Sequence, residues 1–278
     1  MSLKEKRKQG GTMKSAKDDP KPVDRGGLMM SAEGFKGMAR SPKEAIEHVV
    51  LANRILANEG VLDAFGHVSL RNPENSNTYF QSRSLSPQFV TKQDVLEIDL
   101  DGNVVTKTDM RPYGERIIHA AVLKARPDVN AVFHGHPLQV IPFTVTNTPI
   151  RPIAHFGGMF YEGIPLYDDY DVSSGMLIAT REEGERIARA LGSSRALLMR
   201  GHGCVVVGDS IQSMVMAAIN LRDNAQVQLW AMQLGQPKFL SYEEGRQARK
   251  IAQESAVALG RAWEYWVARA KKAMPDIA

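Results

Sequence analysis

The chain has 278 residues, 43% of them hydrophobic and 24% charged, a composition that can bury a sizeable core and excludes a disordered or fibrous protein. Its single cysteine, Cys204, excludes an intrachain disulfide and a CxxC zinc module, and predicts a reducing compartment, the cytoplasm. Residues 1–40 carry ten basic and five acidic side chains, so the formal charge of +4 leaves −1 for residues 41–278. The near-neutral charge of residues 41–278 does not indicate a nucleic-acid-binding face. The apolar patterning does not indicate a signal peptide or a membrane span.

Two regions are expected along the chain. Residues 1–40 are rich in Lys, Gly and Asp without a sustained period, and we expect a basic, flexible N-terminal tail. Ser41 and Glu44 form a capping box with Pro42 at the first helical position, and Gly60 is a stop signal, which predicts a helix between Ser41 and Gly60. We expect one domain over residues 41–278, C-terminal helices included.

Short strands and helices are predicted in irregular alternation. The patterns predict strands at His67–Arg71, Thr78–Gln81, Val95–Leu100, Asn103–Thr106, Asn130–Phe133, Ala196–Met199 and Cys204–Val207. They predict helices at Tyr113–Ala125, Arg181–Leu191, Ser210–Leu234 and Tyr242–Ala270. Asp101-Gly102 is a typical hairpin turn. Hairpins mixed with helices favour one α/β domain with a mainly antiparallel central sheet.

Three of the seven histidines stand where a metal ion could be bound. His134 and His136 follow a buried apolar run, so their rings project to the same side at a strand end. His202 lies between two glycines in a predicted tight loop and would complete a three-histidine set with open coordination positions. The alternatives are hydrogen-bonded histidines at a strand end and an ordinary turn residue.

Glu115 and His119 are four residues apart on a predicted helix and therefore share a face. A carboxylate in the first turn of a helix also interacts favourably with the helix dipole, so the spacing alone does not decide between a structural and a catalytic role.

Taken together, the ordered motifs resemble the class II aldolase/adducin family over roughly residues 44–235. They are Glu115-x3-His119, Arg126-Pro127-Asp128-Val129, the run from Ala131 to Pro137, and Arg200-Gly201-His202-Gly203. The resemblance implies a single three-layer α/β/α domain with a mainly antiparallel sheet. It also implies a C4-type homotetramer with active sites at subunit interfaces. By position it implies that one divalent ion per subunit, Zn²⁺ or Mn²⁺, is held by His134, His136 and His202, and that Glu115 is an acid/base that also reaches the metal. His119 resembles a family position that is not a ligand.

The substrate class is suggested by two departures from the sugar-phosphate aldolases. These enzymes resemble one another in a Ser-Ser pair before the glutamate, where this chain has Tyr113-Gly114, and in an early asparagine, where this chain has His67. Both changes remove phosphate contacts. His67 and the segment Ser82-Arg83-Ser84 look like the branch that decarboxylates hydroxylated aromatic or pyridine dicarboxylates, such as dihydroxyphthalates and 3-hydroxy-2-methylpyridine-4,5-dicarboxylate.

We therefore predict a metal-dependent decarboxylase of a hydroxylated aromatic or pyridine dicarboxylate, acting through a metal-stabilised enolate-like carbanion. Glu115, or a water on the metal, would protonate the ring carbon, and His67 would contact a carboxylate. Arg83 would pair with a carboxylate bidentately, or is a surface arginine. Ser69 and Ser86 would add hydroxyl contacts, or serve as turn residues.

Two other functions stay open. One is an aldolase-type lyase acting on a small non-phosphorylated hydroxy-carbonyl compound through the same ligands. The other is a non-catalytic, adducin-like interaction module, which the retention of three histidines and the glutamate disfavours. The expected partner is a small-molecule aromatic acid, with no nucleic acid and no membrane.

Overall fold

The computed structural model describes residues 38–253 and 255–276, so the predicted N-terminal tail lies outside the described residues except for its last three positions. The first helix, α1, spans Pro42–Asn58. Its start is fixed by Ser41, whose side chain accepts a hydrogen bond from the Glu44 backbone N–H. The predicted helix between Ser41 and Gly60 is confirmed.

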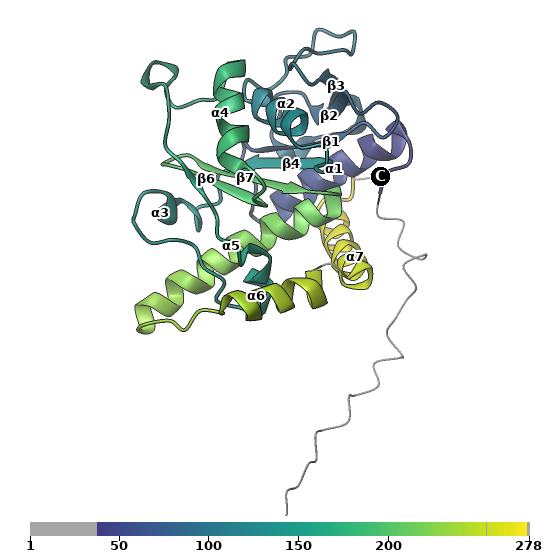
Figure 1. Ribbon diagram of the computed structural model, residues 1–278. Helices are drawn as coiled ribbons and strands as arrows, with labels where there is room; N and C mark the ends of the chain where they lie inside the picture. The colour runs from purple at the N-terminus through teal and green to yellow at the C-terminus, as the bar shows by residue number, and fades with distance from the viewer. Residues whose placement is uncertain (1–37, 254, 277–278) are drawn as a thin grey trace, which may run out of the picture. The chain divides into compact units, whose positions relative to one another are not determined.

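The centre of the fold is one sheet of seven strands in the order β3-β2-β1-β4-β7-β6-β5 (Figure 1). The strands are β1 His67–Arg71, β2 Thr78–Ser82, β3 Val95–Asp99, β4 Ala131–Gly135, β5 Leu166–Tyr167, β6 Ala196–Met199 and β7 Gly203–Gly208. Five pairings are antiparallel and one, between β5 and β6, is parallel. The sheet is therefore mixed, and the expectation of a mainly antiparallel sheet is corrected. The two residues of β5 are too short a run to give an alternation pattern that a sequence reading detects.

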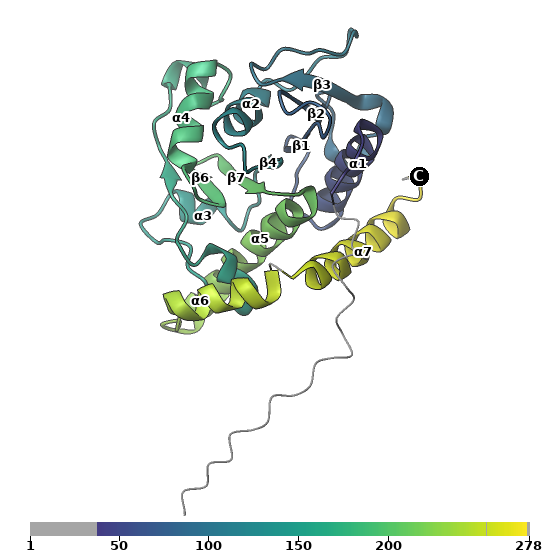
Figure 2. The same ribbon diagram turned by 45° about the vertical axis from the view of Figure 1, so that its right-hand side comes forward.

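Helices cover both faces of the sheet (Figures 1 and 2). One face carries α1, α5 (Ile211–Leu234) and α7 (Ala256–Ala273), and the other carries α2 (Arg116–Ala125) and α4 (Arg181–Leu191). Successive strand residues point to opposite faces, so Phe133 joins the core under α1 and α5 while Val132 joins the core under α2 and α4. Burial on both faces explains why the central strands are almost continuously apolar.

Three local predictions are corrected. The segment Asn103–Thr106 forms only an isolated bridge between Val104 and Ile98, because the Asp99 carboxylate binds the backbone of the turn at Asp101 and Asn103. The predicted C-terminal helix is divided into α6 (Tyr242–Ala248), a π-helical turn (Arg249–Gln253) and α7, which starts anew because Ser255 caps the Ala258 N–H. A short helix, α3 (Ile141–Thr144), was not predicted.

The register of β4 and β7 brings two distant motifs together. Gly135 pairs with Cys204, so the end of β4 lies beside the start of β7 and the turn that precedes it. A Cβ atom on Gly203 would stand 2.3 Å from the Gly135 carbonyl oxygen, so a glycine is needed for this close approach. Among the helices in the described part of the chain, none has the length and apolar character required to cross a membrane.

Candidate metal centre

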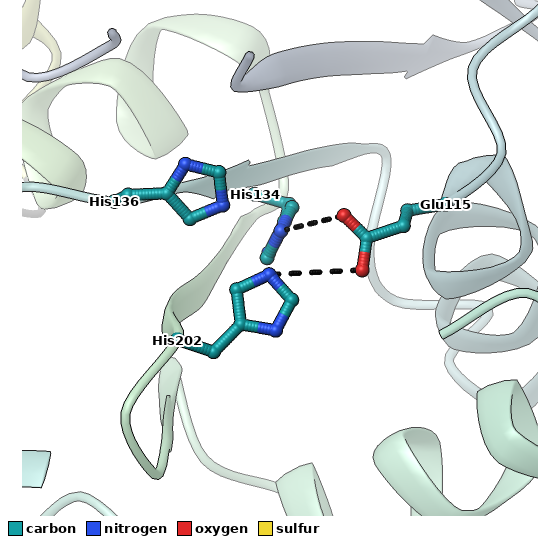
Figure 3. A group of neighbouring side chains, drawn as sticks. All are labelled: Glu115, His134, His136 and His202. Atoms are coloured by element: carbon teal, nitrogen blue, oxygen red, sulfur yellow. Dashed lines mark ion pairs between the residues drawn. The ribbon is translucent and has the colours of Figure 1, made fainter. Parts of the chain in front are cut away.

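Four side chains meet at this end of the sheet: Glu115, His134, His136 and His202 (Figure 3). Strand β4 supplies His134, and His136 is the residue directly after the end of that strand. The turn between β6 and β7 supplies His202. One potential ligand atom from each side chain lies within 4.8 Å of the others. The set that the sequence predicted as metal ligands is thus assembled from three separate parts of the chain.

Glu115 is oriented toward the three imidazoles rather than along its helix. Helix α2 begins at Arg116, later than predicted, and Glu115 occupies the N-cap position without making a capping hydrogen bond. Its carboxylate oxygens lie 3.3 Å from His134 Nε2 and 3.7 Å from His202 Nε2, as the dashed lines in Figure 3 mark. The Ile178 N–H donates a hydrogen bond to it over 3.1 Å. The carboxylate is therefore placed as a ligand or a base.

The charge state of the group also suits a cation. Burial opposes ionisation of Glu115, but His134, His202 and the Ile178 N–H lower the pKa of the carboxyl group well below its ordinary range. Burial, with His134 nearby, lowers the pKa of His202 to about 4, and burial lowers the pKa of His136 in the same direction. At neutral pH Glu115 is therefore a carboxylate, and His136 and His202 are neutral imidazoles, the forms that bind metals.

The ring nitrogens of the centre have few partners in the protein. His134 Nε2 lies 3.3 Å from the Glu115 carboxylate, while His134 Nδ1 and His136 Nε2 are buried without a hydrogen bond, although buried polar groups are nearly always satisfied. The outer nitrogens are held instead: His136 Nδ1 lies 3.0 Å from Asp63 Oδ2, and His202 Nδ1 lies 3.2 Å from the Met176 carbonyl oxygen. Such outer contacts fix the tautomer and leave Nε2 free as a ligand atom. The residues present fit a divalent cation.

Four residues around the centre were missed by sequence reasoning: Asp63, Tyr170, Met176 and Ile178. Met176 has a left-handed φ of 68°, rare for a residue with a Cβ, and strain of this kind concentrates at functional sites. The Tyr170 ring stacks on His202 with centroids 6.4 Å apart, and its hydroxyl is buried without a partner. Burial raises the pKa of Tyr170. None of these residues lies in a motif, so no pattern in the sequence marks them.

A second histidine group lies beside the first, on the other side of His134. His67 on β1 pairs in register with His134 on β4, and their ring centroids are 5.3 Å apart. His67 Nδ1 lies 2.7 Å from His119 Nε2, and His119 Nδ1 lies 2.7 Å from Ser69 Oγ. His119 thus has the hydrogen-bonded position beside the site that its place in the motif implied. Ser69 faces His119, within hydrogen-bonding distance of its ring.

Arg83 and Ser86 make their contacts with residues outside the four-residue centre. Arg83 Nε forms an ion pair of 2.6 Å with Asp94, and Ser86 precedes a short 3-10 turn, Pro87–Phe89, where its carbonyl accepts a hydrogen bond from Phe89. Tyr113, by contrast, lies against His67 with ring centroids 4.3 Å apart, and its hydroxyl donates to the Leu85 carbonyl.

Comparisons with known proteins identify decarboxylases among the relatives of this chain. The chain is 32% identical to the decarboxylase tropJ of Talaromyces stipitatus over 239 residues, which covers 77% of this chain and 89% of the relative. It is 32% identical to a 3,4-dihydroxyphthalate decarboxylase of Arthrobacter keyseri over 209 residues, 69% of this chain and 80% of that protein.

The solved structures include an L-fuculose 1-phosphate aldolase from Glaciozyma antarctica PI12 that resembles this fold with a TM-score of 0.72 and 25% identity. The match covers 89% of this chain and 94% of that one. The family model "Class II Aldolase and Adducin N-terminal domain" matches residues 47–229. Decarboxylase and aldolase relatives are both carbon–carbon lyases, and this protein is a lyase that belongs to the class II aldolase and adducin family.

Proposed function

We propose that the protein is a metal-dependent decarboxylase of a hydroxylated aromatic or pyridine dicarboxylate. The observation that carries the proposal is the group of three imidazoles and one carboxylate, whose potential ligand atoms lie within 4.8 Å of one another and include buried ring nitrogens without a hydrogen bond. Support for the substrate class comes from relatives at 32% identity that are decarboxylases, one of them acting on 3,4-dihydroxyphthalate.

In this proposal His134, His136, His202 and Glu115 hold one divalent ion, Zn²⁺ or Mn²⁺. When bound, the ion acts as a Lewis acid that stabilises the negative charge developing on the substrate. Asp63 and the Met176 carbonyl orient two of the rings, and the Ile178 N–H orients the glutamate. The centre is thus rigid before the ligand arrives, which reduces the cost of reorganisation during the reaction.

Decarboxylation breaks the bond between the ring carbon and the carboxylate, leaves the electron pair on the ring and requires one proton at that carbon. Glu115 is ionised in the folded protein, so it first accepts the proton of the ring hydroxyl and then returns it to the ring carbon as carbon dioxide departs. We assign His67 to a substrate oxygen, since its Nδ1 is occupied and its ring adjoins His134. Arg83 and Ser86 stay candidate substrate contacts, whereas the Ser69 hydroxyl lies 2.7 Å from His119 Nδ1 and would contribute through that ring.

Phosphorylated substrates are disfavoured by the residues that precede and face the centre. Tyr113 and Gly114 stand in place of a pair of hydroxyl side chains, and the Tyr113 hydroxyl is already bound to the Leu85 carbonyl. His67 occupies the position of an amide and is itself held by His119. Neither position presents the set of small donors that a phosphate dianion requires.

We also propose that the enzyme is a cytoplasmic homotetramer with active sites at subunit interfaces. Two large apolar side chains flank the site residues and are exposed in the single chain, Phe65 at 73% and Leu138 at 81%. Exposed apolar groups next to a site favour a neighbouring subunit over them. Light scattering that finds a monomer at micromolar concentration would remove this part of the proposal.

The decisive experiment is a substrate panel. Purified protein with Mn²⁺ or Zn²⁺ is given hydroxyphthalates, dihydroxybenzoates and pyridine dicarboxylates, and carbon dioxide release is followed. The competing function is an aldolase-type lyase, which the structural likeness to an L-fuculose 1-phosphate aldolase favours. Cleavage of small hydroxy-carbonyl compounds or of fuculose 1-phosphate, with no aromatic acid consumed, would replace our proposal by that one.

A variant test addresses the role of the glutamate. Glu115→Gln keeps the shape of the side chain but cannot accept a proton, so turnover should fall at least about a hundredfold, while far-ultraviolet circular dichroism stays unchanged. Full turnover in this variant would leave Glu115 with the helix-dipole role alone.

A further inference from the structure

The side chains of His67, Ser69, Gln81 and His119 form a hydrogen-bonded group, and the proposed function does not explain the contacts within it. All four side chains are buried, with at most 1% of each residue exposed. They come from three elements, because β1 carries His67 and Ser69, β2 carries Gln81 and α2 carries His119. The contacts run in a line: Ser69 Oγ to His119 Nδ1 at 2.7 Å, His119 Nε2 to His67 Nδ1 at 2.7 Å, and Gln81 Nε2 to His67 Nδ1 at 3.2 Å.

Each of these contacts needs one proton, and the amide of Gln81 decides where the protons lie. Gln81 Nε2 can only donate, so His67 Nδ1 must be an acceptor. His119 Nε2 is then the donor in the contact between the two rings, since two bare nitrogens would repel at 2.7 Å. His119 Nδ1 is left as an acceptor, and the Ser69 hydroxyl donates to it.

The remaining nitrogen of His67 therefore carries the hydrogen. Both rings are neutral, because an imidazole that accepts a hydrogen bond at Nδ1 carries its single hydrogen on Nε2. The contacts of His67 among the described residues all involve Nδ1, so its Nε2–H is available to a ligand. A neutral imidazole N–H beside a site where negative charge develops is a recognised electrophilic hydrogen-bond donor.

We infer that Ser69, His119 and Gln81 are positioning residues that fix His67 as an Nε2–H donor aimed at an anionic oxygen of the ligand at the four-residue centre. The identity of that oxygen, a carboxylate or phenolate of a hydroxylated aromatic acid, rests on the proposed function. The assignment of the Nε2–H tautomer to His67 does not depend on the proposed function. Ser69 thereby acts through His119 and His67 rather than on the substrate.

The first experiment needs no substrate. Protein labelled with ¹⁵N-histidine is studied by two-bond ¹⁵N–¹H correlation at pH 7 in the absence and presence of Mg²⁺ as a diamagnetic probe, and the variants His67→Gln and His119→Leu assign the two rings. We expect both rings as single Nε2–H tautomers in the wild-type protein. In a Gln81→Leu background, where no amide holds His67 Nδ1 as an acceptor, Ser69→Ala should give a mixture of tautomers at His119 and His67. A proton on His67 Nδ1 in the wild-type protein would overturn the inference.

A matched control separates this effect from the loss of any buried hydroxyl. Thr78 lies at the far end of β2, is 6% exposed, and its hydroxyl donates to Glu97 over 2.6 Å. In the same Gln81→Leu background, Thr78→Val should leave both tautomers unchanged. The same tautomer change in Thr78→Val as in Ser69→Ala would show a general loosening of the sheet and would count against the inference.

The second experiment uses turnover of the aromatic acid found in the substrate panel. His119→Leu should lower kcat about tenfold with KM and metal content unchanged, and His119→Gln, whose amide can donate to His67 Nδ1, should recover most of the loss. In a His67→Gln background His119→Leu should cause no further loss. Equal losses in His119→Leu and His119→Gln, or losses that add to that of His67→Gln, would mean that His119 only supports the fold. If no aromatic acid is consumed, the proposed function fails and the tautomer experiment alone decides the inference.

Discussion

Two histidine groups lie on either side of the pairing between β1 and β4, and they are built in opposite ways. In the candidate metal centre, His134 and His136 have buried ring nitrogens without a hydrogen bond, and His134 Nε2 contacts only the Glu115 carboxylate. In the adjacent group, His67 and His119 use their nitrogens on each other and on Ser69. An unpaired buried polar atom costs about 1–3 kcal/mol, so a ligand that binds these nitrogens would remove a cost from the first group. The second group contributes to stability and holds its rings in place.

The largest expected effect comes from one matched pair of substitutions. His134 and His119 are both fully buried, at 0% exposure, so alanine leaves a similar cavity at each position. His134→Ala should abolish metal binding and lower turnover at least about a thousandfold. His119→Ala should retain the metal yet, in EDTA, be less stable than His134→Ala by about 1–3 kcal/mol, because it removes two contacts of 2.7 Å whereas His134→Ala removes one contact of 3.3 Å with Glu115.

Elemental analysis, turnover and urea unfolding measure the three quantities. Equal stabilities for the two alanine variants, or one equivalent of metal in His134→Ala, would contradict the view that one group binds metal and the other stabilises the fold.

The orientation of His136 provides the next test. Asp63 accepts hydrogen bonds from the backbone N–H groups of Phe65 and Gly66 with one oxygen and holds His136 Nδ1 with the other. In Asp63→Asn the amide N–H would face Nδ1 and move the ring proton to Nε2, the nitrogen that the metal needs. Metal affinity should fall about 10- to 100-fold, as measured by calorimetric titration.

Asp101→Asn is the control, since Asp101 pairs with Lys124 on the surface and contacts no member of the centre. An affinity loss of similar size in both variants would show a general effect of charge rather than the orientation of His136.

The paired group should also impose a pH dependence on stability. Burial lowers the pKa of His67 and His119 in the folded state, so below about pH 6.5, the ordinary histidine value, the unfolded chain binds more protons than the folded one. Stability is therefore complete above that pH and declines as the pH falls, by up to about 1.4 kcal/mol per pH unit for each ring. Urea unfolding in EDTA at pH 7 and pH 5.5 measures the decline, which should be shallower in His119→Leu. A free energy of unfolding that is constant over this range would contradict the buried neutral pair.

The smallest effect concerns the Tyr170 hydroxyl, which is buried without a hydrogen-bond partner. Tyr170→Phe removes a buried hydroxyl that has no partner, so stability should be unchanged or rise by up to about 1 kcal/mol. Tyr167→Phe is the control, because its hydroxyl donates to the Asp169 carbonyl and its loss should cost about 1 kcal/mol. A clear loss of stability in Tyr170→Phe by thermal unfolding would show that its hydroxyl is paired in solution.

Local chemistry made much of the fold predictable. The Ser41 cap, the Ser210 cap that starts α5 and the alternation in β1 each depend on neighbouring residues, and these elements were predicted to within a residue or two at each end. The division of the C-terminal helix and the parallel strand β5 were not predictable in this way. A helix restart set by one serine, and a strand of two residues, produce patterns too short to stand out from their surroundings.

The sequence by itself determined which residues are candidates for the chemistry: three histidines and a glutamate in ordered motifs, with His67 and His119 as further candidates, because imidazoles and carboxylates in such motifs are few and specific. Only the tertiary structure decided which nitrogens are free and which are held. That outcome depends on the register of β1 against β4 and on contacts from Asp63, Gln81 and the segment Met176–Ile178, residues in no motif. A hydrogen bond depends on distance and direction across the folded chain, and these are not properties of neighbouring residues in the sequence.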